Sequence, residues 1–512
     1  MLKRIRIILA GIVFILCTFL FLDFSGLMTR WFGWLAKIQF LPAALALNEI
    51  IVIVLLLLTL IFGRVYCSII CPMGIFQDVV MATNKGWRKR HKKQFSWSPE
   101  KKWLRYGVFV IFIAAMILGA NALVALLAPY SSYGRIAQNL FAPIWMWGNN
   151  LCAWIAEKAG GYAFEHKEVW IRSLPTFIIA CVTFIAVYIL AARNGRTYCN
   201  TICPVGTLLS FFSRFAIFRP VIDKSRCKTC HLCERNCKAA CIDLKEHKVD
   251  YSRCVDCFDC IDTCKFGAMK YKPFWKASGK DSGAAGKAKS SAEAKKGVAP
   301  GSGDNGRRAF IGTTALTLGA LTLGAQEKKV DGGLAAVIGK KIPERTVPLV
   351  PFGALSVKEF YQHCTACQLC VSQCPNGVLR PSTSLEHLMQ PEMSYERGWC
   401  RVECNKCSQV CPSGPIKAYS IEEKTTMHIG TAKVDLDLCV VNRDGVSCGN
   451  CARHCPSGAI MMVRKDPSDK DSLRIPAVDE SRCIGCGACE FLCPSRPFSA
   501  IHVNGLSVHR KD

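Results

Sequence analysis

Cysteine is the residue type with the clearest chemistry in this chain, which holds 32 cysteines among 512 residues. Twenty-four fall into six groups of four, and four more form two C-x3-C-P pairs. Such groups are typical of metal centres, whereas a secreted disulfide scaffold would be short and would lack apolar membrane segments. The pattern therefore predicts ligation of a cofactor. Outside it, we expect Cys17, Cys152 and Cys181 to be packing residues, and Cys241 to neighbour a cluster.

Two groups near the middle of the chain have the C-x2-C-x2-C-x3-C spacing of bacterial two-cluster ferredoxins. In that arrangement three thiolates on one loop bind three irons of a cubane, and the fourth cysteine binds the neighbouring cluster. Zinc, the alternative, favours two separated C-x2-C pairs. We therefore predict one [4Fe–4S] cluster on Cys227, Cys230, Cys233 and Cys264, and another on Cys254, Cys257, Cys260 and Cys237.

Two details of these groups affect their interpretation. Lys238 and Lys265 stand where proline usually follows the last cysteine, and a cation near each cluster favours its reduced state. Cys227-Lys-Thr-Cys230-His231 also matches the C-x-x-C-H pattern of c-type haem attachment. We interpret this match as coincidental, because its cysteines are in phase with the group of four and covalent haem is attached outside the cytoplasm.

Four further groups lie in the C-terminal part, and a proline that fixes the turn follows the fourth cysteine of each. Cys400 and Cys439 are the least regular first ligands, since a C-x3-C opening follows one and an eight-residue insertion the other. We predict four outer clusters and six in all, and the exchange of ligands among the outer groups stays open. The groups are Cys364/Cys367/Cys370/Cys374, Cys400/Cys404/Cys407/Cys411, Cys439/Cys448/Cys451/Cys455 and Cys483/Cys486/Cys489/Cys493.

Two shorter motifs, GRVYCSIICP and GRTYCNTICP, form an internal repeat, each at the end of an apolar segment. Pseudo-symmetry would bring their four thiols together as a seventh metal site or a redox dithiol system. The alternative is that they are buried thiols at helix ends. The cysteines concerned are Cys67, Cys71, Cys199 and Cys203.

Apolar segments separated by basic loops account for 51% hydrophobic residues together with a net charge of +27. Nucleic-acid binding is the other explanation of this charge, but the basic runs flank apolar segments and form no separate basic face. The basic loop 85–93 and the N-terminus are expected in the cytoplasm, and the segment 129–168, with three tryptophans, outside against the membrane interface. The predicted spans are 5–24, 43–63, 106–128 and 172–192.

After the first two clusters the chain loses its large apolar side chains, and we expect a disordered basic linker. Arg307 and Arg308 then precede the modestly apolar Thr313–Ala325, which resembles a twin-arginine export signal inside the chain. An ordinary fifth membrane helix is the alternative, and both place the remaining chain outside. Export of a folded, cluster-containing domain favours the twin-arginine route.

The predicted fold is multi-domain, with an α-helical membrane domain and α+β ferredoxin-like domains. No histidine lies inside a predicted span, which excludes a membrane haem b, and no Walker or Rossmann glycine loop supports nucleotide binding. The expected order is a membrane domain (1–222), a cytoplasmic two-cluster domain (223–272), a linker (273–306), an export signal or anchor (307–326) and an extracytoplasmic four-cluster domain (327–512).

These motifs resemble a known pair of proteins joined end to end. Residues 1–272 resemble the NapH-type membrane ferredoxins, whose core the NosR and CcoG-type proteins share, with four helices, two C-x3-C-P motifs and two clusters. Residues 307–512 resemble the NapG-type ferredoxins, which are exported by the twin-arginine route with four clusters. The resemblance implies a quinol dehydrogenase component that passes electrons to a periplasmic reductase.

The leading functional prediction is therefore electron transfer in the bacterial cytoplasmic membrane, from the quinone pool to an extracytoplasmic redox partner. A cytoplasmic electron carrier is a further candidate partner, and nucleic acid is not expected. The competing classes are a NosR- or CcoG-like protein that reduces or matures a metal site, and a passive scaffold. An apolar layer of ~30 Å separates the two cluster sets, so a mobile quinol or docking of the outer domain must bridge it.

Overall fold

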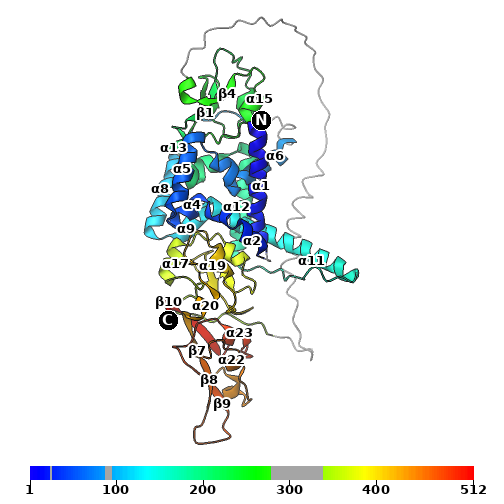
Figure 1. Cartoon of the computed structure of the whole chain (residues 1–512), viewed down its shortest axis with the longest axis vertical. Helices are drawn as coiled ribbons and strands as arrows, with labels where there is room; N and C mark the ends of the chain where they lie inside the picture. Colours follow the sequence, from blue (N-terminus) through cyan, green and yellow to red (C-terminus); the bar gives the residue numbers. More distant parts are fainter. Residues whose placement is uncertain (24–25, 87–94, 278–337) are drawn as a thin grey trace. The chain divides into compact units, whose positions relative to one another are not determined.

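A computed structural model describes residues 1–23, 26–86, 95–277 and 338–512 (Figure 1). Met1–Ala277 and Lys340–Asp512 belong to one unit, and Ser278–Gly339 to a second. Nearly all of the predicted linker, Arg307, Arg308 and the apolar Thr313–Ala325 lie outside the described residues.

Two helices of the N-terminal half, α1 (Leu2–Leu22) and α12 (Leu174–Asn194), are long and apolar enough to cross a membrane. Each has 21 residues, and much of each surface is exposed and apolar. They correspond to the first and fourth predicted spans. Helices of this kind suggest association with a membrane.

The second and third predicted spans are shorter, interrupted helices, so among the described residues the structure supports two of the four predicted spans. Residues 43–63 are divided between α4 (Phe40–Leu45) and α5 (Glu49–Phe62), because the Asn48 side chain caps α5 and Gly63, with φ of 76°, ends it. Residues 106–128 are divided between α8 (Lys102–Leu118) and α9 (Asn121–Leu127), where Gly119 has φ of 75°.

The segment predicted to lie outside against the interface divides into two parts. Its first part, α10 (Pro129–Ile136), is wholly buried among the other helices, which corrects that prediction. After the π-helical η2 (Ala137–Phe141), α11 (Ala142–Lys158) exposes apolar side chains around most of its circumference. Among them are the predicted interface residues Trp145, Trp147 and Trp154.

The internal repeat has the same local structure in both copies. A glycine with positive φ ends an apolar helix, a π-helix follows, and a proline begins the next helix, where its missing N–H costs nothing. Short helices α2 (Leu27–Phe32) and α3 (Trp34–Lys37) precede the first copy. The copies are η1 (Tyr66–Ile70) with α6 (Pro72–Thr83), and η3 (Tyr198–Ile202) with α13 (Pro204–Ser213).

The two-cluster region is a small α+β fold next to these helices. Its strands β1 (Phe218–Ile222) and β4 (Met269–Pro273) pair antiparallel, as do β2 (Ile242–Asp243) and β3 (Lys248–Val249). One helical segment follows each cysteine loop, and another follows β4. These are α14 (Leu232–Arg235), α15 (Asp259–Thr263) and the 3-10 helix η4 (Phe274–Ala277).

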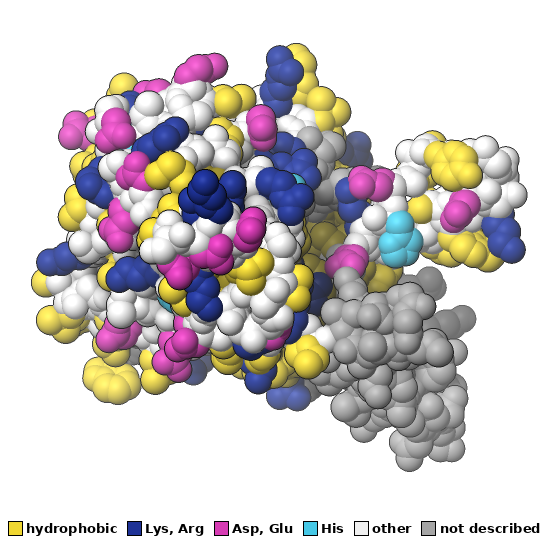
Figure 2. All heavy atoms as spheres, turned by 90° about the horizontal axis from the view of Figure 1, so that it is seen from below, with side chains coloured by type: hydrophobic (Ala, Val, Ile, Leu, Met, Phe, Trp, Pro, Cys, Tyr) yellow, Lys and Arg dark blue, Asp and Glu magenta, His cyan; other side chains and the backbone are white. Residues whose placement is uncertain are grey.

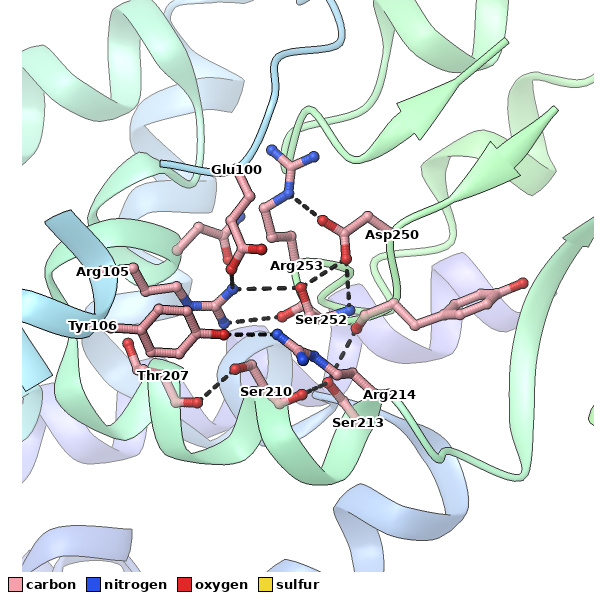
Figure 3. A network of polar contacts seen from close by, with 12 residues as sticks. Glu100, Arg105, Tyr106, Thr207, Ser210, Ser213, Arg214, Asp250, Ser252 and Arg253 are labelled. Carbon is pink, nitrogen blue, oxygen red and sulfur yellow. Dashed lines mark hydrogen bonds and ion pairs between the residues drawn. The ribbon is translucent and has the colours of Figure 1, made fainter. Parts of the chain in front are cut away.

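A buried polar network joins this fold to the helices (Figure 3). The guanidinium of Arg105, on α8, donates hydrogen bonds to Glu100 (2.7 Å) and to the carbonyl oxygen of Ser252 (3.1 Å). Ser213, at the end of α13, donates to the carbonyl oxygen of Tyr251 at 3.0 Å. Because Arg105 is fully buried, these bonds fix the loop that leads into Cys254.

The C-terminal part contains three antiparallel strand pairs and short helices that lie within its cysteine groups or beside them in the chain. The pairs are β5 (Leu379–Pro381) with β6 (Pro391–Met393), β7 (Met427–Val434) with β10 (Ile501–Lys511), and β8 (Ile460–Arg464) with β9 (Arg474–Val478). The helices are α17 (Val357–His363), α18 (Leu369–Ser372), α19 (Lys406–Val410), α20 (Ile421–Thr425), α21 (Val440–Arg443), α22 (Asn450–Arg453) and α23 (Ala488–Leu492). On the face in Figure 2, acidic and basic side chains are intermixed with apolar ones.

Candidate iron–sulfur centres

Four of the six cysteine groups have the same backbone conformation. In each, the second and fourth residues after the first cysteine have positive φ, and most of these residues are not glycine. Left-handed backbone at a non-glycine residue costs energy and is concentrated at functional sites. The residues are Thr229 and His231, Asp256 and Phe258, Ala366 and Gln368, and Gly485 and Gly487.

The two middle groups exchange their fourth cysteines around two cavities. One cavity is lined by Cys227, Cys230, Cys233 and Cys264. The other is lined by Cys254, Cys257, Cys260 and Cys237. The structure therefore brings together the two sets of four that the ferredoxin spacing predicts.

Cys241 also lines the second of these cavities, with its Sγ 3.5 Å from that of Cys237. Hydrogen bonds with Cys237 and Cys254 raise the pKa of Cys241 well above its usual range. Its thiol therefore remains protonated beside the two ligand positions. Of the other cysteines outside the groups, Cys17 is buried in α1, Cys181 is partly buried in α12 and Cys152 is exposed on α11.

The four outer groups exchange cysteines in the same way, which the spacing alone left open. Two cavities are each lined by three cysteines of one group and the fourth of a neighbouring group, and the irregular Cys400 and Cys439 are among the lining residues. The lining cysteines are Cys400, Cys404 and Cys407 with Cys374, and Cys439, Cys448 and Cys451 with Cys493.

The electrostatic neighbours of two buried thiols favour the remaining two sets. Burial raises the pKa of Cys370 well above its usual range, and Cys367, Cys364, Cys411 and, after them, Cys407 of the neighbouring set raise it further. Burial likewise raises the pKa of Cys489, with contributions from Cys486, Cys483 and Cys455. Thiols in such surroundings ionise only beside a positive charge, which iron supplies.

Backbone contacts connect the outer sets in sequence. The Cys400 N–H donates to the carbonyl oxygen of Cys486 at 3.0 Å, and the ring of Tyr395 packs against Gly487. Cys374 and Cys493 connect the first and last pairs of sets. Each is the fourth cysteine of its own group in the sequence and lines the cavity of a neighbouring group. The sets thus follow one another from Cys367 through Cys400 and Cys486 to Cys448.

A single metal ion needs tightly gathered ligands, whereas a cubane holds its four thiolates at separate corners. In the described part of the chain, no three His, Cys, Asp or Glu side chains gather closely enough for one ion. His231, of the haem-like pattern, instead contacts Glu234 through Nδ1 at 2.7 Å.

Cations lie near two of the sets. Lys238, which the sequence placed beside a cluster, forms ion pairs with Asp259 (2.9 Å) and Asp78 (3.5 Å), while Lys265 is exposed. Sequence reasoning missed Lys424, whose buried ammonium contacts the Sγ of Cys400 and the carbonyl oxygen of Arg401. No local signal distinguishes Lys424 from a surface lysine, because it lies in a short polar helix behind two glutamates.

The cysteines of the C-x3-C-P repeat also come together in a buried position. Arg64 donates to the Cys67 Sγ (3.8 Å) and the Cys199 carbonyl oxygen (3.1 Å). Arg196 makes the reciprocal contacts, with the Cys199 Sγ (3.9 Å) and the Cys67 carbonyl oxygen (2.8 Å). Cys71 and Cys203 interact electrostatically with the same thiols.

Four family models for iron–sulfur domains match this chain. A 4Fe-4S binding domain model matches residues 46–93 and 174–224, which contain the C-x3-C-P repeat. Models of 4Fe-4S dicluster domains match residues 250–378, 363–416 and 446–496. These matches support [4Fe–4S] clusters as the cofactors.

The methylamine utilization ferredoxin-type protein MauM of Methylobacillus flagellatus is 32% identical over 167 residues, which cover 31% of this chain and 70% of that protein. MauM of Methylophilus methylotrophus is 29% identical over 162 residues, covering 31% and 71%. An uncharacterized protein of Methanocaldococcus jannaschii is 37% identical over 84 residues, covering 16% and 33%. No solved structure matches. The chain therefore belongs to the MauM ferredoxin-type family and is an iron–sulfur electron-transfer protein.

Proposed function

We propose that this protein binds six [4Fe–4S] clusters and carries electrons between the quinol pool and an extracytoplasmic reductase. The observation that carries the proposal is the crossed arrangement of cysteines, because each shared pair of groups places two clusters side by side. The outer ligand sets are Cys364/Cys367/Cys370/Cys411, Cys400/Cys404/Cys407/Cys374, Cys483/Cys486/Cys489/Cys455 and Cys439/Cys448/Cys451/Cys493. The inner sets are those predicted from the spacing.

The helical region is proposed to lie in the bacterial cytoplasmic membrane. Ile8 and Val182 are 62% and 61% exposed on the two long helices, where lipid would cover them. The exposed tryptophans of α11 suit a membrane interface. In this arrangement the two-cluster region is cytoplasmic, and Arg307 and Arg308 direct the C-terminal domain outward, as the resemblance to NapH- and NapG-type proteins implies.

Contacts between the helices and the first outer loop support a direct electron path. The Asn139 side chain donates to Gln368 at 3.0 Å, and Gln373 donates to the Leu20 carbonyl oxygen at 2.9 Å. Both bonds are buried, so they hold the loop of Cys367 against α1 and η2. We therefore propose that docking of the outer domain against the helices shortens the path across the apolar layer between the two cluster sets.

The proposed reaction is the oxidation of a quinol. A quinol releases two electrons and two protons to become a quinone, and each [4Fe–4S] cluster accepts one electron. The clusters then pass both electrons, one at a time, to the partner protein.

Anaerobic membranes containing the full chain test this proposal. A menaquinol analogue is expected to bleach the cluster absorbance and to generate reduced-cluster EPR signals, and membranes from cells without the protein are the control. Absence of quinol-dependent reduction, with clusters that dithionite still reduces, would contradict it and favour a NosR- or CcoG-like maturation role. Clusters that no reductant reduces reversibly would leave only a scaffold.

A further inference from the structure

The two C-x3-C-P copies build a closed thiol site within the helical region. Cys67, Cys71, Cys199 and Cys203 are each only 4% exposed. The arginine of each copy reaches across to the other copy, so the two halves are held in register. Gln77 on α6 also donates to the Cys199 Sγ at 3.1 Å. π-helices such as η1 and η3 are frequent at functional sites.

Two buried cations contact the thiol site, since Arg64 and Arg196 are both fully buried. Arg196 pairs with Asp78, which also receives the charges of Arg6 and Lys238. Within the described residues the Arg64 guanidinium forms no direct ion pair with a carboxylate and hydrogen-bonds Asn200 and two cysteines. The buried carboxyl of Asp256 lies near enough for an electrostatic interaction with Arg64 and compensates part of this charge. Buried charges require compensation, which a four-thiolate cubane with its net negative charge provides.

On one side the thiol site contacts the loops of the nearest cluster. Arg64 donates to the carbonyl oxygen of Ser252, two residues before Cys254. The Arg196 N–H donates to the carbonyl oxygen of Lys238, which follows Cys237. Each copy thus holds one ligand loop of the same proposed cluster.

On the other side, buried aromatic and cationic side chains lead to the first outer set. Tyr66 and Tyr198 each precede a thiol of the site, and both are fully buried or nearly so. Arg135 on α10 interacts electrostatically with both Tyr198 and Cys367. Gly134 packs so closely on the Cys367 carbonyl that a Cβ there would clash. The thiol site therefore lies between the two cluster sets.

We propose that Cys67, Cys71, Cys199 and Cys203 bind a seventh [4Fe–4S] cluster that relays electrons between the inner and outer sets. This seventh cluster adds an intermediate carrier to the proposed function, and the direction of electron flow through it rests on that function. Each step moves one electron: the core of the donor cluster goes from [4Fe–4S]+ to [4Fe–4S]2+ as the core of the acceptor cluster goes from [4Fe–4S]2+ to [4Fe–4S]+, and no bond or proton is exchanged. The relay divides the long gap into shorter steps.

Iron and acid-labile sulfide analysis of the anaerobically purified full chain tests the count. Seven cubanes give about 28 irons and six give about 24. Cys71→Ser and Cys203→Ser, equivalent by the internal repeat, are each expected to lose about four irons, while Cys181→Ser, in the same helical region, loses none. A wild-type count near 24 with no loss in either variant would overturn the proposal.

Proteoliposomes test the relay. Dithionite does not cross a bilayer, so in the wild type it is expected to bleach the clusters on both faces through the seventh centre. In Cys71→Ser and Cys203→Ser only the outward-facing clusters bleach quickly. Zinc or copper bound at the four thiols, or unchanged bleaching in the variants, would refute the relay. The iron count tests for the seventh cluster even if quinol is not the electron donor. The count in the wild-type protein tests for it even if a variant fails to fold.

Discussion

The ammonium of Lys424 lies 3.2 Å from the Sγ of Cys400 and is completely buried. Its other partners are neutral: the carbonyl oxygens of Arg401 and Cys404, and the ring of Phe352 at 4.9 Å. A cation beside a cluster stabilises the reduced state, which carries one more negative charge. We therefore expect this lysine to hold the potential of the proposed cluster at Cys400 above that of a cluster without such a neighbour.

Replacing this lysine should lower one outer potential. A hydrogen bond to a charged group contributes at least about 1.5 kcal/mol, so Lys424→Met is expected to shift one cluster down by about 60 mV. EPR-monitored redox titration measures the shift. Lys433→Met, at an exposed position on β7, is the control. Equal potentials in both variants would remove the assigned role.

Double variants distinguish crossed ligation from ligation within one group. If the clusters are bound by the crossed ligand sets, the double variant Cys370→Ser with Cys374→Ser removes one ligand from each of two clusters, and the protein loses about eight irons. Cys370→Ser with Cys411→Ser removes two ligands of one cluster and costs about four. Iron analysis of the purified chain provides the comparison. The opposite order of losses would show that each outer group binds its own cluster.

The protonated Cys241 thiol is expected to tune the neighbouring inner cluster. A neutral hydrogen bond contributes about 1 kcal/mol, so Cys241→Ala should lower that cluster's potential by about 40 mV. Iron content should stay at the wild-type value, because the four predicted ligands remain. Cys152→Ala, at an exposed thiol, is the control. Loss of about four irons would instead make Cys241 a ligand.

Contact between α10 and the Cys367 loop should be sensitive to one methyl group. In Gly134→Ala the new Cβ meets the Cys367 carbonyl and the ring of Phe21. Overpacking of this kind costs about 1–3 kcal/mol, and we expect slower electron transfer between inner and outer clusters with an unchanged iron content. Gly148→Ala, where nothing lies nearby, is the control. Identical rates would argue against the docking path.

His509 should make the C-terminal domain sensitive to mild acid. Burial lowers its pKa to about 4, its Nδ1–H donates to the Ala354 carbonyl oxygen, and its Nε2 is buried without a partner. The unfolded chain takes up this proton near its ordinary pKa of about 6.5. Stability is therefore complete above about pH 6.5 and is lost progressively as the pH falls towards 4, by up to about 3 kcal/mol.

Denaturant-induced loss of cluster absorbance at about pH 7 and about pH 5 measures this effect. His509→Gln, which cannot be protonated, should lose less stability between the two pH values than the wild type. Clusters themselves are acid-labile, so the informative quantity is the difference between the two proteins. An equal loss in both would show that His509 does not contribute.

The amino-acid sequence by itself determined the chemistry, because cluster ligation depends on short-range spacing. Groups such as Cys227 to Cys237 hold three cysteines for one cluster on one loop, and the fourth cysteine, predicted to bind the neighbouring cluster, is only a few residues further along the chain. Gly63 and Gly119 also stand in the sequence, inside or at the end of predicted spans. Apolar length alone predicts continuous spans there, whereas the helices end at these glycines.

Only the tertiary structure decided which outer groups share ligands, that Lys424 faces Cys400, and that α10 is buried against the Cys367 loop. These relationships join residues distant in the chain, and no local pattern encodes which loops meet. The C-x3-C-P thiols show both contributions. Their repeat was evident in the sequence, but the reciprocal contacts of Arg64 and Arg196 exist only because the two copies fold face to face.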